Sequence, residues 1–501
     1  MTKKEILEKS KYYARYKRAY MYVAMVFEFD HSTIAPKKGL EEGNEAMSVL
    51  MNDIFKTFKS EDYIEYVKAA YEKREEFSPE YKRLFELNYK GYKKEQNLSP
   101  ELQYEYQIAA NNAYTKWLEA KNKSDYSIFE PSLNKLVELT QKIISLREEK
   151  FATPYDSLLD DFEPGNNEVI LDDFFSQLKA RIVPLLKKIQ NSKKQIRSDF
   201  LEYKISVPKQ EKVSNYLLKF NGFDMSSGVL STTEHPFTTF PSHHDVRVTT
   251  HYFPTRFASN MFSVIHEGGH GIFAQNEPDK FYEIGLAGSM TSAQHECMSR
   301  FYENLVGRNE NYIHAIWKKI SSICKKEYSD VSEKEFFEGV NLARASLIRT
   351  ESDELTYCLH IMVRYEIEKD LINGKISTKD LNKEWNKRYS EYLGVSVSND
   401  KEGILQDVHW SNGSFGYFPS YALGNAYASQ ILNTMKKDID FDDLLKNGKL
   451  KDIKAWLKKK AFSIASLKDP NDWLKEITGE ALNTDYYLSY LEEKFEKLFE
   501  L

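Results

Sequence analysis

The segment His266-Glu267-Gly268-Gly269-His270 constrains the fold of this chain more than any other feature. Residues four apart share one face of an α-helix, so the two imidazoles can approach one cation while Glu267 flanks it. A helix flanked by apolar side chains on several sides has to be buried. Such side chains surround the segment at Met261, Phe262, Val264, Ile265, Ile272 and Phe273. The sequence therefore predicts a buried helix with two metal ligands, the alternative being a pair of structural histidines.

The two adjacent glycines in this helix need a separate explanation. Each glycine costs a helix roughly 1 kcal/mol relative to alanine, so a pair needs a reason. The reason we expect is a close approach to the helix backbone, by a substrate or by a second packed helix.

A catalytic zinc ion takes three protein ligands and keeps one position open, so a third ligand is expected downstream. His295-Glu296 is the best candidate, since it lies within Ser289–Gly307, a segment with the apolar periodicity of an amphipathic helix. We favour Glu296 as the ligand, with His295 as the alternative.

This ligand set predicts a reaction. Two neutral imidazoles and one carboxylate leave residual positive charge on the metal, which lowers the pKa of a bound water to about 7 and polarises a carbonyl. Glu267, which is not a ligand, can accept the proton of the water as general base and pass it to the leaving amine. The chemistry indicated is hydrolysis of a peptide or amide bond.

Charge and cysteine content indicate which class of substrate and which cellular compartment suit this chain. The net charge of −6, from 70 basic and 76 acidic residues, gives no field for nucleic acid or an anionic membrane, and small substrates such as peptides fit better. The apolar run Ala19–Phe27 is too short to span a bilayer and late for a signal peptide. The three cysteines form no C-x-x-C pair, which favours a reducing cytoplasm: Cys297, Cys324 and Cys358.

Periodicity along the chain predicts a mostly α protein. Residues 3–147 read as successive amphipathic helices, and a loop-like break at residues 151–167 is a candidate hinge. Residues 226–253 favour a small β-sheet. Helices then continue to Leu501, interrupted by the Gly-rich and aromatic stretch Gly403–Gly424. Without repeats or a low-complexity linker, we expect one peptidase domain over residues 1–501.

Several longer motifs, in the same order, are shared with a known family, so the chain resembles the carboxypeptidase Taq family of metallocarboxypeptidases over nearly its whole length. Two positions depart from the family pattern: Phe29 replaces a tryptophan, and Cys297 replaces a serine. Besides the two histidine segments above, the motifs are His235-Pro236-Phe237, Asp245–Thr249, Ile348–Thr350, Asp353–Tyr357, Gly403–Trp410 and Gly416–Asn425.

The resemblance implies a helical, cleft-shaped fold like that of neurolysin and angiotensin-converting enzyme, with a small sheet near the active site and a homodimeric assembly. It also implies zinc-dependent release of single residues from peptide carboxyl termini, with broad specificity. Cobalt suits the same two-histidine, one-carboxylate ligand set.

A carboxypeptidase has to bind the terminal carboxylate of its substrate, and a guanidinium offers a planar fork for that anion. We assign this role to Arg349, which we place on a helix with Asp353, Thr356 and His360 as one polar stripe. An Arg349–Asp353 ion pair is the structural alternative. The resemblance adds His409 as a second donor, for which a buried structural histidine is the alternative.

The oxyanion of the tetrahedral intermediate needs a donor, which a tyrosine hydroxyl near the metal can supply. Tyr417 and Tyr421 both qualify. Resemblance to related peptidases favours Tyr421, with Tyr417 placed among the substrate-binding residues.

The sequence leaves two competing functions open. A thimet-type oligoendopeptidase shares the helix motif and the Glu ligand but needs no carboxylate anchor, so Arg349 and His409 discriminate against it. A non-catalytic helical protein that binds metal or peptide is the other. Glu267 argues against it, because a structural metal site has four protein ligands and no spare base.

Overall fold

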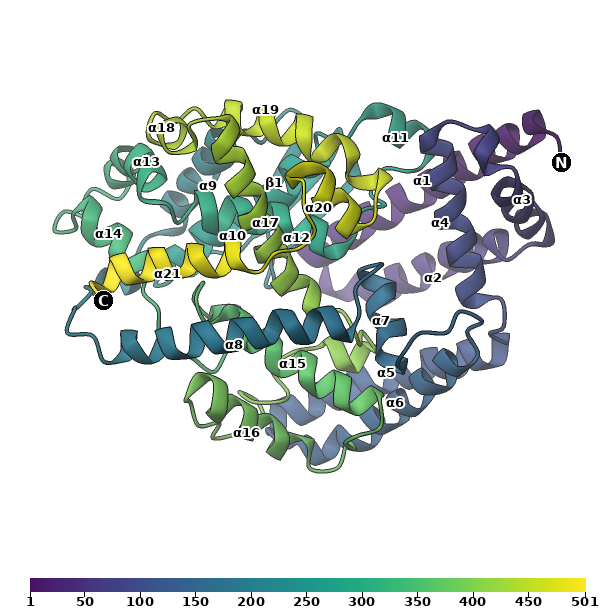
Figure 1. The fold of residues 1–501 in the computed structure, drawn as a ribbon, viewed down its shortest axis with the longest axis horizontal. Helices are drawn as coiled ribbons and strands as arrows, with labels where there is room; N and C mark the ends of the chain where they lie inside the picture. Colours follow the sequence, from purple (N-terminus) through teal and green to yellow (C-terminus); the bar gives the residue numbers. More distant parts are fainter.

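The computed structural model describes all residues 1–501 and confirms a mostly α fold with one small sheet (Figure 1). No helix is long and apolar enough to cross a membrane. The first helices are α1 (Lys3–Thr33), α2 (Leu40–Phe58), α3 (Glu61–Glu72), α4 (Pro79–Glu95), α5 (Pro100–Lys123), α6 (Glu130–Ser145), α7 (Pro154–Phe162), α8 (Glu168–Gln190) and α9 (Val207–Asn221). Those after the sheet are α10 (Phe257–Ala274), α11 (Asp279–Ile284), α12 (Ser292–Arg300), α13 (Glu310–Ile323), α14 (Glu333–Val340), α15 (Tyr357–Ile372), α16 (Leu381–Leu393), α17 (Pro419–Asp438), α18 (Phe441–Lys446), α19 (Leu450–Lys460), α20 (Pro470–Thr478) and α21 (Asp485–Phe499).

The predicted break at residues 151–167 is wrong in part, because most of it is the buried helix α7. Thr153 caps this helix: its hydroxyl accepts from the amide of Asp156, and the Asp156 carboxylate accepts from the amide of Thr153. Pro154 occupies the first helical position, where a missing N–H costs no hydrogen bond. The Thr-Pro pair therefore marks the start of a helix here and not a loop.

The predicted sheet is confirmed between α9 and α10. It consists of β1 (Gly228–Thr232), β2 (Thr238–Ser242) and β3 (Asp245–Thr250) in the order β1-β3-β2. β3 pairs parallel with β1 and antiparallel with β2, and Val246 and Val248 on β3 are fully buried. The sheet packs on α10, so it lies directly beside the histidine helix.

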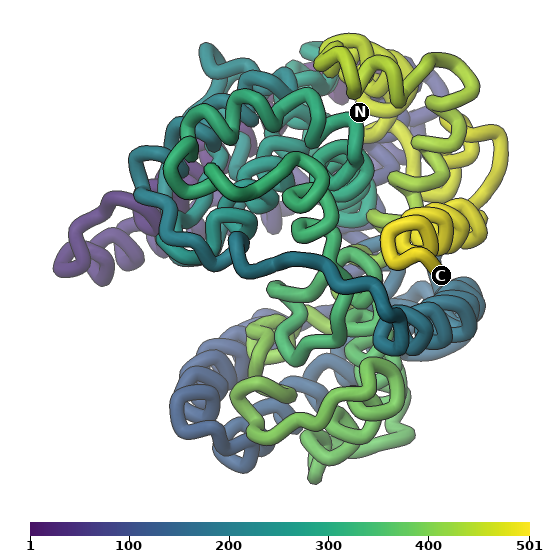
Figure 2. Tube along the Cα trace, turned by 90° about the vertical axis from the view of Figure 1, so that its left-hand side faces the viewer, coloured from purple at the N-terminus to yellow at the C-terminus, as the bar shows by residue number.

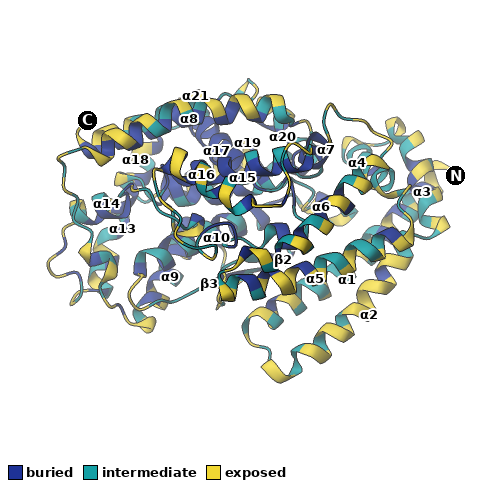
Figure 3. Ribbon diagram, turned by 90° about the horizontal axis from the view of Figure 1, so that it is seen from below, coloured by how far each residue is buried: buried dark blue, intermediate teal, exposed yellow.

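The hydrophobic core has two parts. A cluster of 99 buried residues runs through the body of the molecule, and a separate cluster of nine joins α1, α3, α4 and α11 near the N-terminus. Helix α2 contributes no buried residue to either cluster: Ile54 is its one buried residue, and Phe58 at its end packs against the smaller cluster. The α1–α2 hairpin projects from the body (Figure 2), and α2 is largely exposed (Figure 3).

Close helix packing at glycines places the ligand helix α12 between α10 and α17. A Cβ at Gly269 would lie 2.8 Å from the carbonyl oxygen of Met298, and one at Gly424 would lie 2.7 Å from the Cβ of Glu296. The predicted close approach to the histidine helix is thus made by a packed helix, while Gly268 faces Leu218 of α9. The break predicted at Gly403–Gly424 ends earlier, since α17 begins at Pro419 and contains Gly424.

Candidate active site

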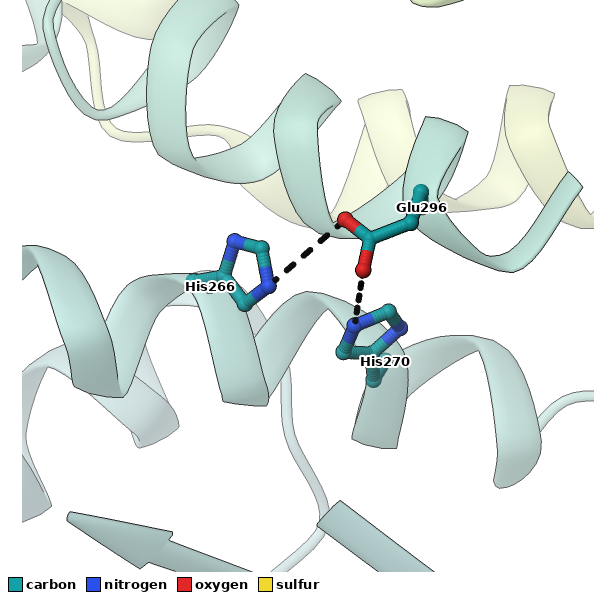
Figure 4. Close-up of side chains that lie close together, drawn as sticks. All are labelled: His266, His270 and Glu296. Atoms are coloured by element: carbon teal, nitrogen blue, oxygen red, sulfur yellow. Dashed lines mark ion pairs between the residues drawn. The ribbon is translucent and has the colours of Figure 1, made fainter. Parts of the chain in front are cut away.

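The side chains of His266, His270 and Glu296 converge on one point. Both histidines lie on α10, one turn apart, and the carboxylate of Glu296 enters between them from α12 (Figure 4). The Nε2 atoms of His266 and His270 each lie 3.8 Å from an oxygen of Glu296, and one ligand atom from each residue lies within 4.8 Å of the others. Ligands at 2.0–2.2 Å from a tetrahedral ion lie roughly 3 to 4 Å apart, so this donor set fits a divalent metal.

The outward-facing nitrogens of both histidines are occupied by other partners. The Nδ1 atom of His266 lies 2.8 Å from Glu303, and that of His270 lies 2.7 Å from Nδ1 of His295. Such contacts fix the ring orientation and leave Nε2 free for a metal. His295 contacts His270, and it is not a member of the three-residue cluster.

Glu303 and Arg300 were missed by sequence reasoning. Glu303 lies in a π-helical turn, Phe301–Val306, that continues α12, and Arg300 donates to it over 3.0 Å. Burial would raise the pKa of Glu303, but Arg300 and His266 lower it to about 2, so it stays ionised. The available signal was that both residues are charged and lie one and two turns beyond Glu296, within an otherwise apolar segment.

We call His266, His270 and Glu296 the metal cluster. Glu267 lies beside this cluster and is buried. Thr238 of β2 donates its hydroxyl to the Glu267 carboxylate over 2.7 Å. Burial raises the pKa of Glu267, which gives the carboxylate a greater proton affinity than an exposed glutamate has. A group with these properties suits a general base that must hold and then release a proton.

Arg349 does not share a helix with Asp353, Thr356 and His360, so the predicted polar stripe is wrong. It lies in the 3₁₀ turn Arg349–Glu351, whereas Asp353 accepts hydrogen bonds from the amides of Leu355 and Thr356 just before α15 begins. The Asp353 carboxylate thus holds a turn that separates Arg349 from the start of α15. The Arg349–Asp353 ion pair is likewise not formed.

Arg349 instead pairs with Asp407 over 2.8 Å. The second oxygen of the Asp407 carboxylate pairs with Arg364 of α15, which is fully buried. Burial would raise the pKa of Asp407, but the two guanidiniums hold it well below its usual range. We call Arg349, Arg364 and Asp407 the arginine cluster; two cations against one anion leave it with a surplus positive charge.

The remaining predicted residues gather around the arginine cluster. Nε2 of His409 lies 3.4 Å from the hydroxyl of Tyr421, and the Tyr421 ring lies 5.1 Å from the guanidinium of Arg349. The rings of Tyr417 and Tyr421 meet edge to face at 5.2 Å. Burial lowers the pKa of His409 to about 4, so it is neutral at pH 7.

Tyr357 separates the metal cluster from the arginine cluster. Its hydroxyl accepts a 3.1 Å hydrogen bond from Arg349, and its ring lies 4.2 Å below the guanidinium of Arg300. Arg300 is in turn 3.6 Å from the carboxylate of Glu296. A cation site and a positively charged anion site therefore lie on either side of one tyrosine.

Comparison with known proteins gives matches over nearly the whole chain. A model of the carboxypeptidase Taq (M32) metallopeptidase family matches residues 9–495. Carboxypeptidase 1 of Bacillus subtilis is 40% identical over 482 residues, 96% of either chain, and thermostable carboxypeptidase 1 of Pyrococcus furiosus is 31% identical over 96% of this chain and 97% of the relative. The crystal structure of the M32 carboxypeptidase from Deinococcus radiodurans superposes with a TM-score of 0.96 at 27% identity, covering 99% of this chain and 100% of the other.

Proposed function

The chain belongs to the carboxypeptidase Taq (M32) metallopeptidase family, a family of metal-dependent peptide hydrolases, and from this we propose that it is a zinc carboxypeptidase whose ligands are His266, His270 and Glu296. The observation that carries the assignment is the convergence of two Nε2 atoms on one buried carboxylate. Nitrogen and carboxylate ligands suit zinc, and cobalt is the second candidate.

We assign the proton transfers to Glu267. When bound, a divalent ion would supply Lewis-acid chemistry, which would polarise the scissile carbonyl and lower the pKa of a water. Glu267 takes the proton from that water and delivers it to the leaving amine, and the hydrogen bond from Thr238 orients its carboxylate. Tyr421 donates to the carbonyl oxygen as negative charge develops there.

We assign binding of the terminal carboxylate of the substrate to Arg349, with His409 and Tyr417 beside it. The surplus positive charge of the arginine cluster supports this, because a buried uncompensated charge is costly and a substrate carboxylate neutralises it. An oligoendopeptidase has no need of such an anion site.

The experiment that tests these assignments is product mapping by mass spectrometry on a peptide and its amidated twin. Wild-type protein is expected to remove residues stepwise from the free acid only, and the Glu267→Gln variant is expected to do so far more slowly with its metal still bound. Internal cuts in both peptides would instead assign the chain to the oligoendopeptidases.

We further propose that the protein is a homodimer, with the exposed apolar side chains of α2 as the contact surface. Val49, Leu50, Met51 and Phe55 are all exposed, Val49 to 67%. Met51 and Phe55 lie four residues apart and so share one face of α2, and exposed apolar side chains that gather on one face mark an interaction surface. Light scattering is expected to give twice the mass of 58.6 kDa, and a Phe55→Glu variant to give the monomer mass.

A cytoplasmic location and a single peptidase domain over residues 1–501 complete the proposal. The three cysteines are buried and unpaired, which suits a reducing compartment. The 99-residue core cluster includes residues before and after residues 151–167 and also Tyr155, Leu158 and Leu159 of α7, which supports one domain without a hinge there.

A further inference from the structure

One buried carboxylate fixes both ends of the segment between His409 and Tyr417. Glu368 of α15 is fully buried. It accepts hydrogen bonds from the indole Nε1 of Trp410 over 2.7 Å and from the amide of Gly416 over 2.9 Å. Trp410 directly follows His409 in the sequence, and Gly416 directly precedes Tyr417.

From this geometry we propose that Glu368 is a positioning residue, which holds His409 and Tyr417 in place for substrate binding. This inference rests on the function proposed for those two residues. Glu368 acts through its two bonded neighbours and does not itself touch the substrate.

The first half of the segment is also held by the 3₁₀ turn His409–Asn412, and the amides of Gly413 and Ser414 bond back to the carbonyls of Trp410 and His409. Its backbone turns at Gly413 and Gly416, which both have positive φ angles of 73° and 91°, so no regular helix continues through it. A Cβ at Gly416 would lie 2.9 Å from the backbone of Leu158, so the segment also runs against α7. Within this turn the amide of Gly416 has no helical carbonyl to bond, and the Glu368 carboxylate takes its place.

A carboxylate is suited to this position because it only accepts hydrogen bonds. A third donor, the hydroxyl of Tyr155 on α7, bonds to Glu368 over 2.8 Å. Oε1 of Glu368 serves Trp410, and Oε2 serves both Gly416 and Tyr155. A glutamine would present an NH₂ group to one of these donors, so the Glu368→Gln variant must lose at least one bond.

Two single-donor variants separate positioning from structural support. Trp410→Phe and Tyr155→Phe each remove one donor from the same buried carboxylate, but only Trp410 belongs to the segment that carries His409. We expect Trp410→Phe and Glu368→Gln to raise KM for a free-acid peptide roughly tenfold or more, as expected for a lost hydrogen bond to a charged group. We expect Tyr155→Phe to change KM less than twofold, and the metal content of all three to match wild type.

A third measurement ties the result to the proposed function. His409→Asn is expected to raise KM at least as much as Trp410→Phe. If His409→Asn raises KM while Trp410→Phe leaves it unchanged, the role of Glu368 is overturned and that of His409 stands. If His409→Asn has no effect, the proposed substrate contact fails and the inference fails with it. Equal KM effects of Trp410→Phe and Tyr155→Phe would show that Glu368 has only a structural role. This comparison can be made even if the Glu368→Gln variant does not fold.

Discussion

The metal cluster and the arginine cluster are both buried and both charged. Negative charges are in excess around the metal cluster, whereas positive charges are in excess in the arginine cluster. Around the candidate metal centre, the carboxylates of Glu296 and Glu303 pair with the guanidiniums of Arg300 and Arg308, while the carboxylate of Glu267 pairs with no arginine. In the arginine cluster, two guanidiniums share one carboxylate. The first arrangement suits a cation and the second an anion.

In the proposed carboxypeptidase site, this difference lets the metal cluster act on the scissile bond while the arginine cluster binds the terminal carboxylate. Buried charges are costly unless they are paired. An excess of negative charge therefore favours binding of a cation, and an excess of positive charge favours binding of an anion. Tyr357 keeps the two clusters apart, which prevents Arg349 from pairing with the acidic residues of the metal cluster. The following predictions test whether each cluster acts on its own.

The largest effect is expected from Glu267→Gln, which removes the proposed general base beside the metal cluster. Loss of a positioned acid–base group lowers the rate by about 10²- to 10⁴-fold. We expect this loss in kcat, with KM for a free-acid peptide and the metal content little changed. A variant that keeps more than a tenth of wild-type kcat would assign the proton transfers to another residue.

Arg349→Ala is expected to have the next largest effect, confined to the arginine cluster. Removing one member of a buried charge pair costs about 2 to 5 kcal/mol, so kcat/KM for a free-acid peptide should fall by roughly 30- to 4,000-fold. Metal affinity should not change. The exposed Arg256, which lies 3.9 Å from Glu351, provides the control, since Arg256→Ala should leave both quantities unaltered.

Glu303→Gln is expected to weaken the metal cluster alone. Glu303 contacts Nδ1 of His266, the ring nitrogen that faces away from the metal cluster, and so orients the ring. Loss of such a partner lowers metal affinity about 10- to 100-fold. Competition with a chelator measures this, with Glu310→Gln as the control because Glu310 pairs only with Lys497 at the surface. An unchanged metal affinity would mean that His266 is held by its helix without this hydrogen bond.

The smallest effect is expected in the pH dependence of stability. Burial lowers the pKa of His409 to about 4, so as pH falls below the ordinary value of about 6.5 the unfolded chain binds a proton before the folded chain does. The free energy of unfolding should therefore fall between pH 6.5 and 4, by at most about 1.4 kcal/mol per pH unit from this residue.

Denaturant unfolding of wild type and His409→Asn over this pH range measures the contribution of His409. The variant should lose less stability than wild type as the pH is lowered from 6.5 to 4, and the two should run parallel above pH 7. Parallel curves throughout would show that His409 titrates alike in the folded and unfolded chains.

Sequence reasoning recovered most of the metal cluster because its signals are local. The spacing of His266 and His270 depends only on helix geometry, and the helix itself follows from apolar periodicity. The glycine pair correctly indicated a close approach, made by α12 at Gly269. Glu296 needed only a second amphipathic helix nearby. The sheet of residues 226–253 and the mostly α fold followed from periodicity in the same way.

The arginine cluster was harder to predict because its partners are distant in the sequence. Local spacing suggested Asp353 as the partner of Arg349, but Asp353 binds the amides of the turn before α15 and Asp407 takes its place. Nothing in the local pattern records that choice, since it depends on how the segment after α16 returns to α15.

The sequence by itself determined the reaction class and the family, and it predicted the proposed histidine ligands and general base, because these depend on residue types at helical spacing. The tertiary structure alone decided which charges meet: Glu303 behind His266, Asp407 between two arginines, and Glu368 at both ends of the His409 segment. The physical reason is that a buried charge is stabilised by whichever opposite charge or donor the packed chain brings within about 3 Å, and sequence separation places no limit on that partner.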